Sequence, residues 1–539
     1  MKKTEIVLLA IQIFFVTSCS SELFSAIDDL AKQIEKEEIL MGILNDMSFE
    51  TNDDYVSRKW YEWTEEHAFI KRNVQKYIAN PLNAFLIIKR GTAEIGLIEK
   101  RHPDVFEVYK ERISKLRPSK ADLRGAVEGL LRLQHIYKFH TYDFYEGIIG
   151  DELTRPALTP HDLFVIGMEA YDIQDYFFAM EYLHLTRELL GKKRDNYKEV
   201  DEVLLYTTLA SGYNQTGFFE GAIDMILEME PNKKVISEQT RQHIDVLLNS
   251  YWDLYNMYNH SLIIDYDAYL DDYGDKIVYN IEHEDILMSR ACRGNLTKSP
   301  IELSLLKCRY VSNSPFSSIA PFKVEEANLD PYVALYIDVL YNNEIEYLMN
   351  ELKPKLERAE MIGIDGERIT SNARVAKNAW LYNDTDEIPM RIDRRIEDMT
   401  GLTQSTSEKL QVSNYGIAGH YNLHWDHSTK NEAEFDGGTG NRIATMMFYM
   451  SDVLIGGETV FPYLKLRITP DKRTAVFWYN LDHSGQGISV TRHAACPVAL
   501  GSKWVLNRWI RERGQEFRRP CLPGKYKEID DELLPNEMF

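Results

Sequence analysis

The stretch HYNLHWDHS, residues 420–428, holds a histidine and an aspartate two positions apart, His424 and Asp426. On a β-strand, residues i and i+2 point to the same face, so one imidazole and one carboxylate can bind a single metal ion side by side. His493, in the strand-like run VTRHAACPV, can supply a third ligand. Two histidines and one carboxylate with open positions beside them form the facial triad of non-haem iron(II) oxygenases. The pattern therefore predicts an Fe(2+) site with room for O2 and an organic cosubstrate.

Lys503 lies ten residues after His493, in the apolar run GSKWVLNRWI at residues 501–510. A lysine buried in such a strand is costly unless its ammonium is paired. In an oxygenase of this kind the C5 carboxylate of 2-oxoglutarate would pair it; otherwise the side chain would extend from a strand edge to water. Thr491 lies two residues before His493 and can donate its hydroxyl to the same carboxylate. We therefore expect Lys503 and Thr491 to hold the cosubstrate.

Short β-branched and aromatic runs fill the C-terminal part of the chain. Clusters of glycine, proline or aspartate separate them, which is typical of strands joined by turns. The clearest runs are KLQVSNYGI (409–417), RIATMMFYM (442–450), TAVFWYNL (474–481) and KWVLNRWI (503–510). Many short strands late in a chain favour a jelly roll or barrel. We predict an oxygenase domain at 331–525 with an early helix at 342–356, after a loop-like linker at 261–330 that carries a disulfide.

The N-terminus has the features of a cleaved signal peptide at residues 1–20. Lys2 and Lys3 give a positive start, an apolar run covers residues 6–16, and small residues follow at 17–20. The alternative is an N-terminal membrane anchor. No later stretch reaches the roughly 18 apolar residues that a span needs. The sequence therefore predicts a protein of the secretory pathway.

Cysteine usage agrees with an oxidising compartment. Once the signal peptide is removed an even number of cysteines remains, which suggests two disulfides in any of three pairings, of which the local one closes the shortest loops. A zinc site is the alternative interpretation. The four cysteines are Cys292, Cys308, Cys496 and Cys521. Four sequons can accept glycans in the lumen, namely Asn214, Asn259, Asn295 and Asn383.

Length and charge exclude some classes of protein. A chain of 539 residues with 44% hydrophobic residues predicts two to four domains with ordinary cores. The formal net charge is −22, whereas a nucleic-acid-binding protein would carry a basic surface. Residues 526–539 form an acidic tail.

Residues 21–140 have a helical pattern that begins with a short heptad stripe. The stripe can form a dimerising coiled coil, or it can pack on its own domain, and the sequence leaves both open. Its members are Leu23, Ile27, Leu30, Ile34, Met41 and Leu44. We expect a helical dimerisation region here.

A second helical region, residues 141–260, contains the phrase GYNQTGFFEGAIDMILEMEPN, which is similar to a tetratricopeptide repeat. Small residues in such a repeat let paired helices approach. Tyrosine rings on a concave helical face suit an extended proline-rich strand; the alternative is that most of these tyrosines are core. The candidate peptide-binding tyrosines are Tyr171, Tyr176, Tyr206 and Tyr213.

Five segments carry a family resemblance: GTGNRIATMMFYMSDV, GGETVFP, RTAVFWYNL, TRHAACPV and ERGQEFRRPC. They resemble the α subunit of animal collagen prolyl 4-hydroxylases, densely over residues 414–521 and by domain order over nearly the whole mature chain. The resemblance implies an α+β multidomain protein with a helical dimerisation region containing a coiled coil, a tetratricopeptide-like peptide-binding domain and a double-stranded β-helix (jelly roll) oxygenase domain.

The same resemblance implies roles for individual residues. His424, Asp426 and His493 correspond to the iron ligands, Lys503 to the 2-oxoglutarate anchor and Tyr213 to a peptide-groove tyrosine. The implied disulfides are the local ones, Cys292 with Cys308 and Cys496 with Cys521. The family works in the endoplasmic reticulum lumen as an α2β2 tetramer, with protein disulfide isomerase as β subunit and L-ascorbate as reductant.

The expected activity is hydroxylation of proline at C4 in collagen-like X-Pro-Gly chains. This reaction is coupled to decarboxylation of 2-oxoglutarate to succinate and CO2. Three positions depart from the family pattern: Leu423, Trp425 and Arg511, the last of which replaces a histidine. Arginine stays charged at physiological pH and cannot act as a neutral imidazole. The alternatives are a lysyl hydroxylase, an oxygenase acting on a non-collagen proline-rich protein, or a catalytically weak peptide-binding or assembly subunit.

Overall fold

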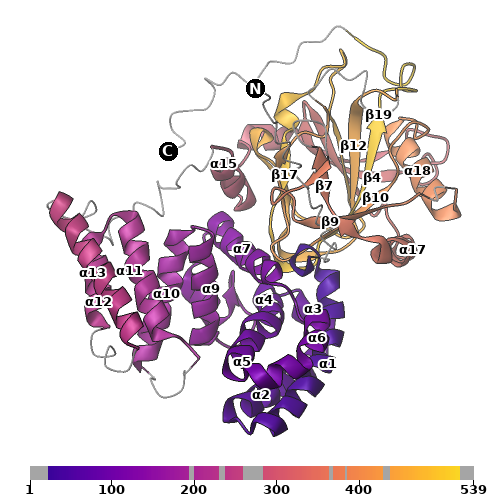
Figure 1. Cartoon of the computed structure of the whole chain (residues 1–539). Coiled ribbons are helices and arrows are strands. Elements are labelled where there is room, and N and C mark those ends of the chain that lie inside the picture. Colours follow the sequence, from indigo (N-terminus) through magenta and orange to yellow (C-terminus); the bar gives the residue numbers. More distant parts are fainter. Residues whose placement is uncertain are drawn as a thin grey trace, which may run out of the picture.

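The computed structural model describes residues 22–192, 199–229, 237–258, 283–362, 368–382, 385–428 and 438–522. The predicted signal peptide, the sequons Asn259 and Asn383, and the acidic tail lie outside the described residues. Within them, a helical N-terminal part is followed by a sheet-rich C-terminal part (Figure 1). None of the described helices has an apolar stretch long enough to cross a bilayer.

The helical part runs from α1 to α13, with one short hairpin. Its helices are α1 (Ile27–Thr51), α2 (Asp54–Ile70), α3 (Val74–Ile78), α4 (Pro81–Lys89), a π-helical turn (Arg90–Glu94), α5 (Ile95–Arg101), α6 (Pro103–Leu116), α7 (Lys120–Tyr137), α8 (Thr141–Glu146), α9 (Pro160–Asp172), α10 (Tyr176–Lys192), α11 (Glu202–Thr216), α12 (Phe219–Glu228) and α13 (Glu238–Tyr258). The hairpin pairs β1 (Ile148–Ile149) with β2 (Glu152–Leu153).

Local sequence explains where the main helices begin. Ser119 and Asp122 form a capping box at the start of α7, and Thr159 and Asp162 form another at the start of α9. In each box the hydroxyl accepts a backbone N–H while the carboxylate accepts the cap residue's own N–H, so two otherwise unpaired donors are satisfied.

The heptad stripe of α1 is buried inside its own chain. All six of its apolar members are 9% exposed or less, and they pack against α2, α4 and α6. Of the two interpretations that the sequence left open, the structure has the helix packed on its own domain, because the surrounding helices supply the apolar surface that a second coil would have supplied.

Helices α9 to α13 stack as successive antiparallel neighbours. Gly167 and Gly212 lie where they touch: a Cβ at Gly167 would meet Leu183 Cδ2 at 2.8 Å, and one at Gly212 would meet Met180 Sδ at 2.4 Å. Small residues at these positions are therefore what lets α9 and α11 approach α10.

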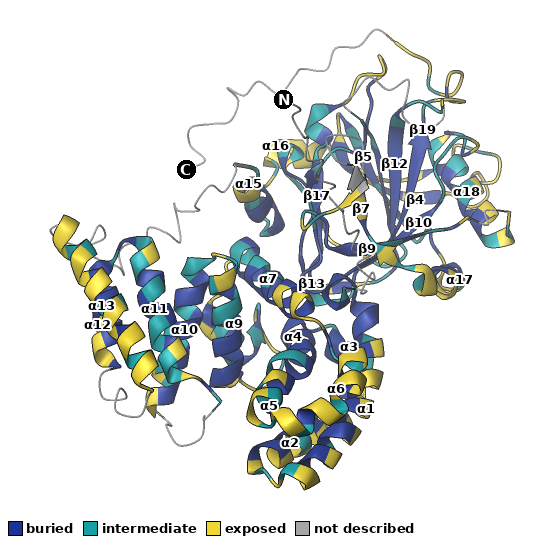
Figure 2. Cartoon of the chain, in the orientation of Figure 1, coloured by how far each residue is buried: buried dark blue, intermediate teal, exposed yellow. Residues whose placement is uncertain are grey.

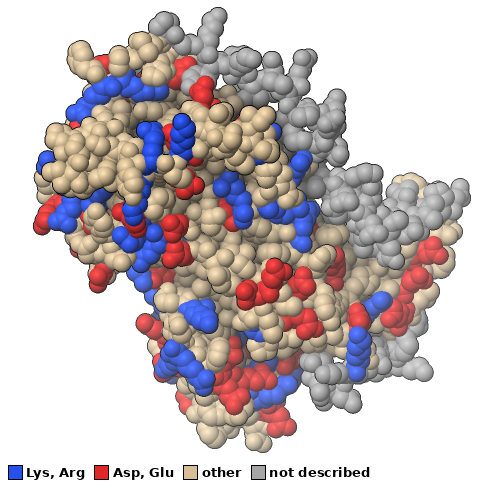
Figure 3. All heavy atoms as spheres, turned by 180° about the vertical axis from the view of Figure 1, so that it is seen from behind, with Lys and Arg blue, Asp and Glu red and all other residues tan. Residues whose placement is uncertain are grey.

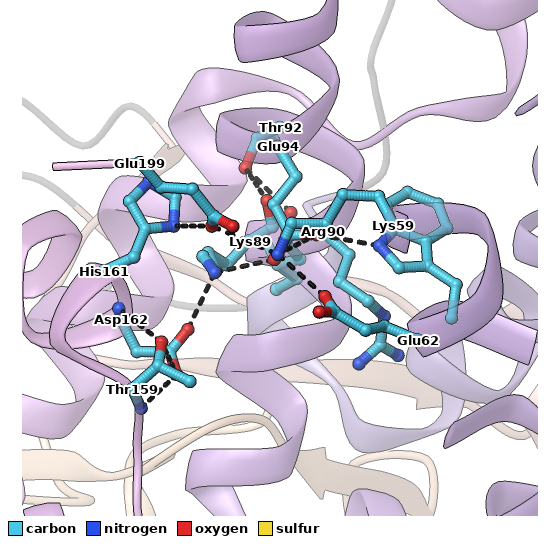
Figure 4. Close-up of polar contacts among 12 residues, drawn as sticks. Lys59, Glu62, Lys89, Arg90, Thr92, Glu94, Thr159, His161, Asp162 and Glu199 are labelled. Atoms are coloured by element: carbon cyan, nitrogen blue, oxygen red, sulfur yellow. Dashed lines mark hydrogen bonds and ion pairs between the residues drawn. The ribbon is translucent and has the colours of Figure 1, made fainter. Parts of the chain in front are cut away.

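A cluster of buried charges joins the first helices to α9 (Figure 4). Lys89 Nζ lies 2.6 Å from Glu94 Oε1 and 2.7 Å from Asp162 Oδ1. Lys59 Nζ lies 3.1 Å from Glu199 Oε2. Since removing one partner of a buried ion pair leaves an uncompensated charge, this cluster fixes how α9 lies against α4.

The C-terminal part is a layered structure, and most of the strands labelled there in the burial view are dark blue (Figure 2). Its nine-stranded sheet has the order β3-β4-β5-β16-β12-β19-β10-β9-β6, and a four-stranded sheet has the order β11-β17-β14-β15. The strands are β3 (Cys308–Val311), β4 (Phe322–Leu329), β5 (Tyr332–Ile337), β6 (Glu357–Arg358), β7 (Glu360–Ile362), β8 (Arg368–Thr370), β9 (Ala376–Trp380), β10 (Gln411–Tyr415), β11 (Tyr421–His424), β12 (Arg442–Tyr449), β13 (Val453–Gly456), β14 (Thr459–Phe461), β15 (Leu466–Ile468), β16 (Ala475–Tyr479), β17 (His493–Ala495), β18 (Val498–Gly501) and β19 (Trp504–Arg511).

Strand β12 shows how the layers form. Ala444, Met446 and Phe448 point to one face, where they pack with α17 (Asn342–Leu352) and α18 (Glu387–Thr400). Met447 and Tyr449 point to the other face, where they meet side chains of the four-stranded sheet. Because successive strand residues alternate between faces, a strand buried on both sides reads as a continuous apolar run.

The predicted strand runs are confirmed as β10, β12, β16 and β19, and the predicted helix at 342–356 as α17. The loop-like interpretation of the linker was wrong over 283–329, where α15 (His283–Cys292), α16 (Pro300–Leu305), β3 and β4 lie. The sheet therefore begins at Cys308, before the expected boundary at 331. The edge strand β3 is short and largely exposed, so it has no apolar pattern to reveal it. In β4 the alternation is confined to its first residues, where Phe322 and Val324 are buried on either side of the exposed Lys323.

The disulfide pairing is also corrected. Cys292 is bonded to Cys496, with Cα atoms 5.7 Å apart, whereas Cys308 and Cys521 are exposed free thiols. Helix α15 packs over β11 and β14, which lie on either side of β17. This packing brings Cys292, at the end of α15, next to Cys496, although the two cysteines are 204 residues apart in sequence. Loop length along the chain could not reveal this packing, so the local pairing inferred from spacing and resemblance was wrong.

Candidate active site

Two neighbouring strands of the four-stranded sheet bring the predicted metal ligands together. His424 ends β11 and His493 begins β17, directly opposite each other in the antiparallel pair. Asp426 lies in the bend just after β11. Its Oδ1 is 3.8 Å from His424 Nε2 and its Oδ2 is 3.9 Å from His493 Nε2. One ligand atom from each of the three lies within 4.8 Å of the others, which is close enough for all three to bind one ion.

Backbone carbonyls fix the orientation of both imidazoles. His424 Nδ1 lies 2.7 Å from the Asn422 carbonyl oxygen, and His493 Nδ1 lies 3.1 Å from the Thr491 carbonyl oxygen. A carbonyl only accepts, so each Nδ1 carries the proton and each Nε2 presents its lone pair toward Asp426. This is the usual way in which a protein selects the ligating tautomer.

The carboxylate has its own support, which sequence reasoning missed. Thr445 Oγ1 donates to Asp426 Oδ2 at 2.6 Å, and Asn480 Nδ2 donates to Thr445 Oγ1 at 2.9 Å. Arg442 Nη1 donates to the backbone carbonyl of Asp426 at 3.3 Å. The signal for Thr445 was present, since it is the polar residue inside the otherwise apolar centre of β12.

The protonation states are those that a metal requires. Burial, together with the neighbouring His493, lowers the pKa of His424 to about 3, and burial also lowers the pKa of His493. Burial alone would raise the pKa of Asp426, but the two histidines and Arg442 outweigh it and bring that pKa to about 2. Near neutral pH the site therefore offers two neutral imidazoles and one carboxylate, the forms that bind metal without releasing a proton.

Lys503, the predicted cosubstrate residue, is a buried cation of the oxygenase domain. It lies just before β19, is 1% exposed, and its ammonium has no hydrogen-bond partner among the described residues. The Nζ atom is 4.9 Å from the centre of the Tyr415 ring and 5.9 Å from that of Tyr449. Burial lowers the pKa of Lys503 to about 7, an effect that Glu458 opposes. An unpaired buried ammonium calls for an anion, and the ligand triad calls for a metal, so these residues fit iron together with a carboxylic acid cosubstrate.

Comparison with known proteins adds the identity of the family. Residues 26–151 match the model for the prolyl 4-hydroxylase alpha-subunit N-terminal region, and residues 410–511 match the 2OG-Fe(II) oxygenase superfamily. Prolyl 4-hydroxylase subunit alpha-2 of Caenorhabditis elegans is 35% identical over 536 residues, which cover 95% of this chain and 95% of that protein. Prolyl 4-hydroxylase subunit alpha-1 of Homo sapiens is 34% identical over 513 residues, which cover 92% and 95%.

The chain belongs to the prolyl 4-hydroxylase α-subunit family.

A solved structure of the viral collagen prolyl hydroxylase vCPH from Paramecium Bursaria Chlorella virus-1 is 26% identical in sequence to this chain. The match covers 33% of this chain and 95% of the viral chain, with a TM-score of 0.28. The family assignment rests on the full-length relatives. As a member of the prolyl 4-hydroxylase family, the chain is a 2-oxoglutarate-dependent prolyl hydroxylase that uses Fe(2+), 2-oxoglutarate and O2.

Thr491 has a different place from the one expected. Its hydroxyl donates to the Ile488 carbonyl oxygen at 2.7 Å, so its proton is not directed at a cosubstrate carboxylate. Its backbone carbonyl instead accepts from His493 Nδ1. The threonine orients a ligand through its main chain, because the short 3₁₀ turn Ser489–Thr491 folds its side chain back on itself.

Arg511, which is expected to depart from the family pattern, lies at the end of β19 and is buried. Its Nη2 is 2.6 Å from Glu408 Oε1, and its Nη1 donates to the Gly440 carbonyl oxygen at 2.9 Å. Glu408 also pairs with Arg442, which in turn contacts the backbone of Asp426. Arg511 thus belongs to an ion-pair cluster that supports the segment around the metal site.

The predicted peptide-binding tyrosines lie on α9, α10 and α11. The Tyr171 hydroxyl is 2.6 Å from Ser211 Oγ, and its ring lies edge-on to Tyr176 with centres 5.4 Å apart. Tyr213 is largely buried, and its hydroxyl lies 2.6 Å from His184 Nε2. Tyr206 is half-buried and donates to Glu228 Oε1 at 3.2 Å. The structure therefore brings Tyr171 and Tyr176 together and places Tyr206 apart.

Two of the four sequons fall on described residues. Asn295 is exposed, just after α15, whereas Asn214 is half-buried within α11, and its Oδ1 has no hydrogen-bond partner among the described residues. A glycan needs an accessible amide nitrogen, so the structure favours Asn295 as the acceptor.

Proposed function

We propose that this chain is the catalytic α subunit of a procollagen-proline 4-dioxygenase, which hydroxylates C4 of proline in collagen-like X-Pro-Gly chains. The observation that carries the proposal is the unpaired, fully buried ammonium of Lys503 in the same domain as the three-ligand group. In the proposal His424, Asp426 and His493 hold Fe(2+), and Lys503 pairs with the C5 carboxylate of 2-oxoglutarate.

The proposed mechanism divides the work between the metal and the protein. Iron, when bound with 2-oxoglutarate and O2, supplies the oxidising power that inserts an oxygen atom into a C–H bond. His424, Asp426 and His493 would hold the metal as a facial triad, which is the ligand type that leaves positions open for a cosubstrate and O2. Thr445 holds the carboxylate of Asp426 in place, and Lys503 orients the cosubstrate by its far end. The buried surroundings exclude bulk water and so strengthen these contacts.

We further propose that α9 to α13 form a tetratricopeptide-like module that binds the peptide substrate. The close approach of neighbouring helices at Gly167 and Gly212 supports the repeat-like packing. The adjacent rings of Tyr171 and Tyr176 offer flat aromatic surfaces for proline rings. Tyr213 is proposed to act at the groove edge through its hydroxyl, and Tyr206 to lie at its periphery.

The assembly and compartment are proposed by analogy with the family. Protein disulfide isomerase would be the β subunit of an α2β2 tetramer in the endoplasmic reticulum lumen, and L-ascorbate the reductant. The disulfide between Cys292 and Cys496 supports an oxidising compartment. A double-stranded β-helix is proposed for the oxygenase domain on the basis of its two facing sheets.

The test is succinate release by the full chain, co-expressed with protein disulfide isomerase, with Fe(2+), 2-oxoglutarate and a (Pro-Pro-Gly) repeat peptide. We expect peptide-dependent succinate, a peptide mass gain of about 16 Da from one inserted oxygen, and loss of both in His424→Ala. His483→Ala is the matched control, because His483 is exposed and outside the ligand group. A folded complex that binds the peptide but releases no succinate would instead identify a peptide-binding assembly subunit.

A further inference from the structure

The first residues of the described chain are packed against the oxygenase domain. In Figure 1 the indigo N-terminal helix lies directly beneath β9 and β10. The Phe24 carbonyl oxygen accepts a hydrogen bond from the Ile417 backbone N–H at 2.8 Å. On the other side, the Leu23 N–H donates to Asp122 Oδ1 of α7 at 2.7 Å. The segment 22–29 is therefore held between α7 and the oxygenase domain, although Phe24 precedes Ile417 by 393 residues in sequence.

The fit at this contact is close. A Cβ at Gly416 would meet the Phe24 carbonyl oxygen at 2.0 Å, and one at Gly125 of α7 would meet the Phe24 ring at 2.4 Å. Under 3.0 Å a real Cβ atom has no room, and at Gly416 the obstacle is backbone, which cannot swing away. Both glycines are thus required for Phe24 to reach Ile417.

Charge is complementary across the contact. Among the described residues, three ion pairs join the segment to the oxygenase domain, and each has its acid on the segment and its base on the domain. Glu22 pairs with Arg358 at 2.7 Å, Asp28 pairs with Lys353 at 2.5 Å, and Asp29 pairs with Lys377. The last pair is nearly buried, with side chains 12% and 5% exposed. Breaking a buried pair from one side leaves a charge without a partner, so the segment is firmly attached.

What the segment touches is the turn that leads into the first metal-ligand strand. Gly416–Gly419 form a tight turn, closed by a hydrogen bond from the Gly419 N–H to the Gly416 carbonyl at 2.9 Å. Ala418 in this turn has φ = 46°, a left-handed conformation that is unfavourable for alanine. Arg132 of α7 donates to the Ala418 carbonyl oxygen at 3.3 Å. Strand β11 begins two residues after the turn and ends at His424.

We propose that the segment 22–29, which we call the N-terminal strap, is a positioning element for the hydroxylation reaction. The strap holds the strained turn Gly416–Gly419 through the hydrogen bond from the Ile417 N–H to the Phe24 carbonyl oxygen, and so sets the position of β11 and of His424. The helical N-terminal region thereby serves catalysis as well as assembly. The inference rests on the proposed role of His424 as an iron ligand.

The physical reason is the short path from the strap to the ligand. From Ile417 to His424 the chain passes through one tight turn and one four-residue strand, so a shift of the turn is carried to the imidazole. A displacement of about 1 Å at a reacting group can cost on the order of 100-fold in rate. We therefore expect loss of the strap to lower kcat about 10- to 100-fold, while KM for the peptide stays within about twofold, because the hydrogen bonds and ion pairs described above join the strap to α7 and to the oxygenase domain.

The test is a charge swap in the full chain with its β subunit. Asp29→Lys places a second ammonium group next to that of Lys377, so the two repel each other. The double variant Asp29→Lys with Lys377→Asp restores an ion pair of reversed polarity. Asp46→Lys is the matched control, since Asp46 is an exposed aspartate on the same helix. Two quantities are measured: kcat for the repeat peptide, and amide hydrogen exchange of residues 415–420 in the metal-free complex.

Asp29→Lys should raise the exchange rate of residues 415–420 at least tenfold and lower kcat, and the swap should return both to within about threefold of wild type. Asp46→Lys should change neither. Unchanged exchange in Asp29→Lys would overturn the strap, and raised exchange with unchanged kcat would overturn its positioning role. If Asp29→Lys does not assemble, the isosteric pair Asp28→Asn with Asp29→Asn is used in the same two measurements. The exchange result stands even if the wild-type protein proves inactive, so failure of the strap and failure of the proposed function are distinguishable.

Discussion

Replacing Lys503 with methionine should make the cosubstrate-free protein more stable while abolishing its response to 2-oxoglutarate. Lys503 is fully buried with a pKa of about 7, against 10.5 for a free lysine. At a pH between these two pKa values, Lys503 of the unfolded chain carries a proton that Lys503 of the folded chain lacks. The free energy of unfolding therefore rises with pH in this range. At pH 7.4 the depressed pKa costs the folded protein about 4 kcal/mol, and at pH 9.5 only about 1 kcal/mol.

Methionine is similar in length and carries no charge, so Lys503→Met removes that cost with little change of packing. We expect up to about 4 kcal/mol of added stability at pH 7.4, which corresponds to roughly 2–4 °C in Tm for each kcal/mol in a domain of this size. The gain should shrink to about 1 kcal/mol at pH 9.5.

The assay is thermal unfolding of the oxygenase domain at both pH values, with and without 2-oxoglutarate. Wild type should gain stability from 2-oxoglutarate, as any ligand of the folded state confers, and Lys503→Met should not. Lys465→Met is the control, because Lys465 is exposed in the same domain and should show no change. A loss of stability at pH 7.4, or a gain that is equal at both pH values, would refute the reasoning, since the ammonium would then not be the source of the cost.

Three further predictions concern the surroundings of the site and the peptide module. Thr445→Val keeps the shape of β12 but removes the donor to Asp426, so affinity for Fe(2+) should fall about 10- to 100-fold, measured by metal titration. Arg511→His removes one of the two guanidinium partners of Glu408, whose side chain is 11% exposed, so the oxygenase domain should lose about 3 kcal/mol of stability in denaturant unfolding. An unchanged midpoint would contradict the ion-pair role. Tyr213→Phe leaves the helix packing intact but deletes the hydroxyl beside His184. KM for a long proline-rich peptide should therefore rise about threefold to tenfold with kcat unchanged, and a fall in kcat alone would contradict a binding role.

Acidic and basic side chains are interspersed over the back of the molecule, with acidic groups gathered on the helical part (Figure 3). This agrees with the net charge of −22. It also fits the polarity of the strap, whose acids face bases of the oxygenase domain. The expectation that the protein is not built to bind nucleic acid follows from charge alone and did not need the fold.

The three-ligand group was predictable from its residue types and from the closeness in sequence of its first two members. The spacing of His424 and Asp426 suggested neighbouring side chains, although Asp426 lies in the bend after the strand rather than within it. Lys503 was predictable because a charged residue inside an apolar run is conspicuous. The strands β10, β12, β16 and β19 were predictable for the same reason, since each is a short apolar run between turn residues.

What the sequence by itself determined was therefore the local chemistry: the ligand types, the buried lysine, the strand runs and the resemblance that they support. Only the tertiary structure decided which distant residues meet. The bond between Cys292 and Cys496, the burial of the α1 stripe in its own domain, and the contact of Phe24 with Ile417 all depend on how helices dock on sheets. The physical reason is that docking is chosen by the summed fit of many weak contacts across hundreds of residues, and periodicity records only which face of each element is buried, not what covers it.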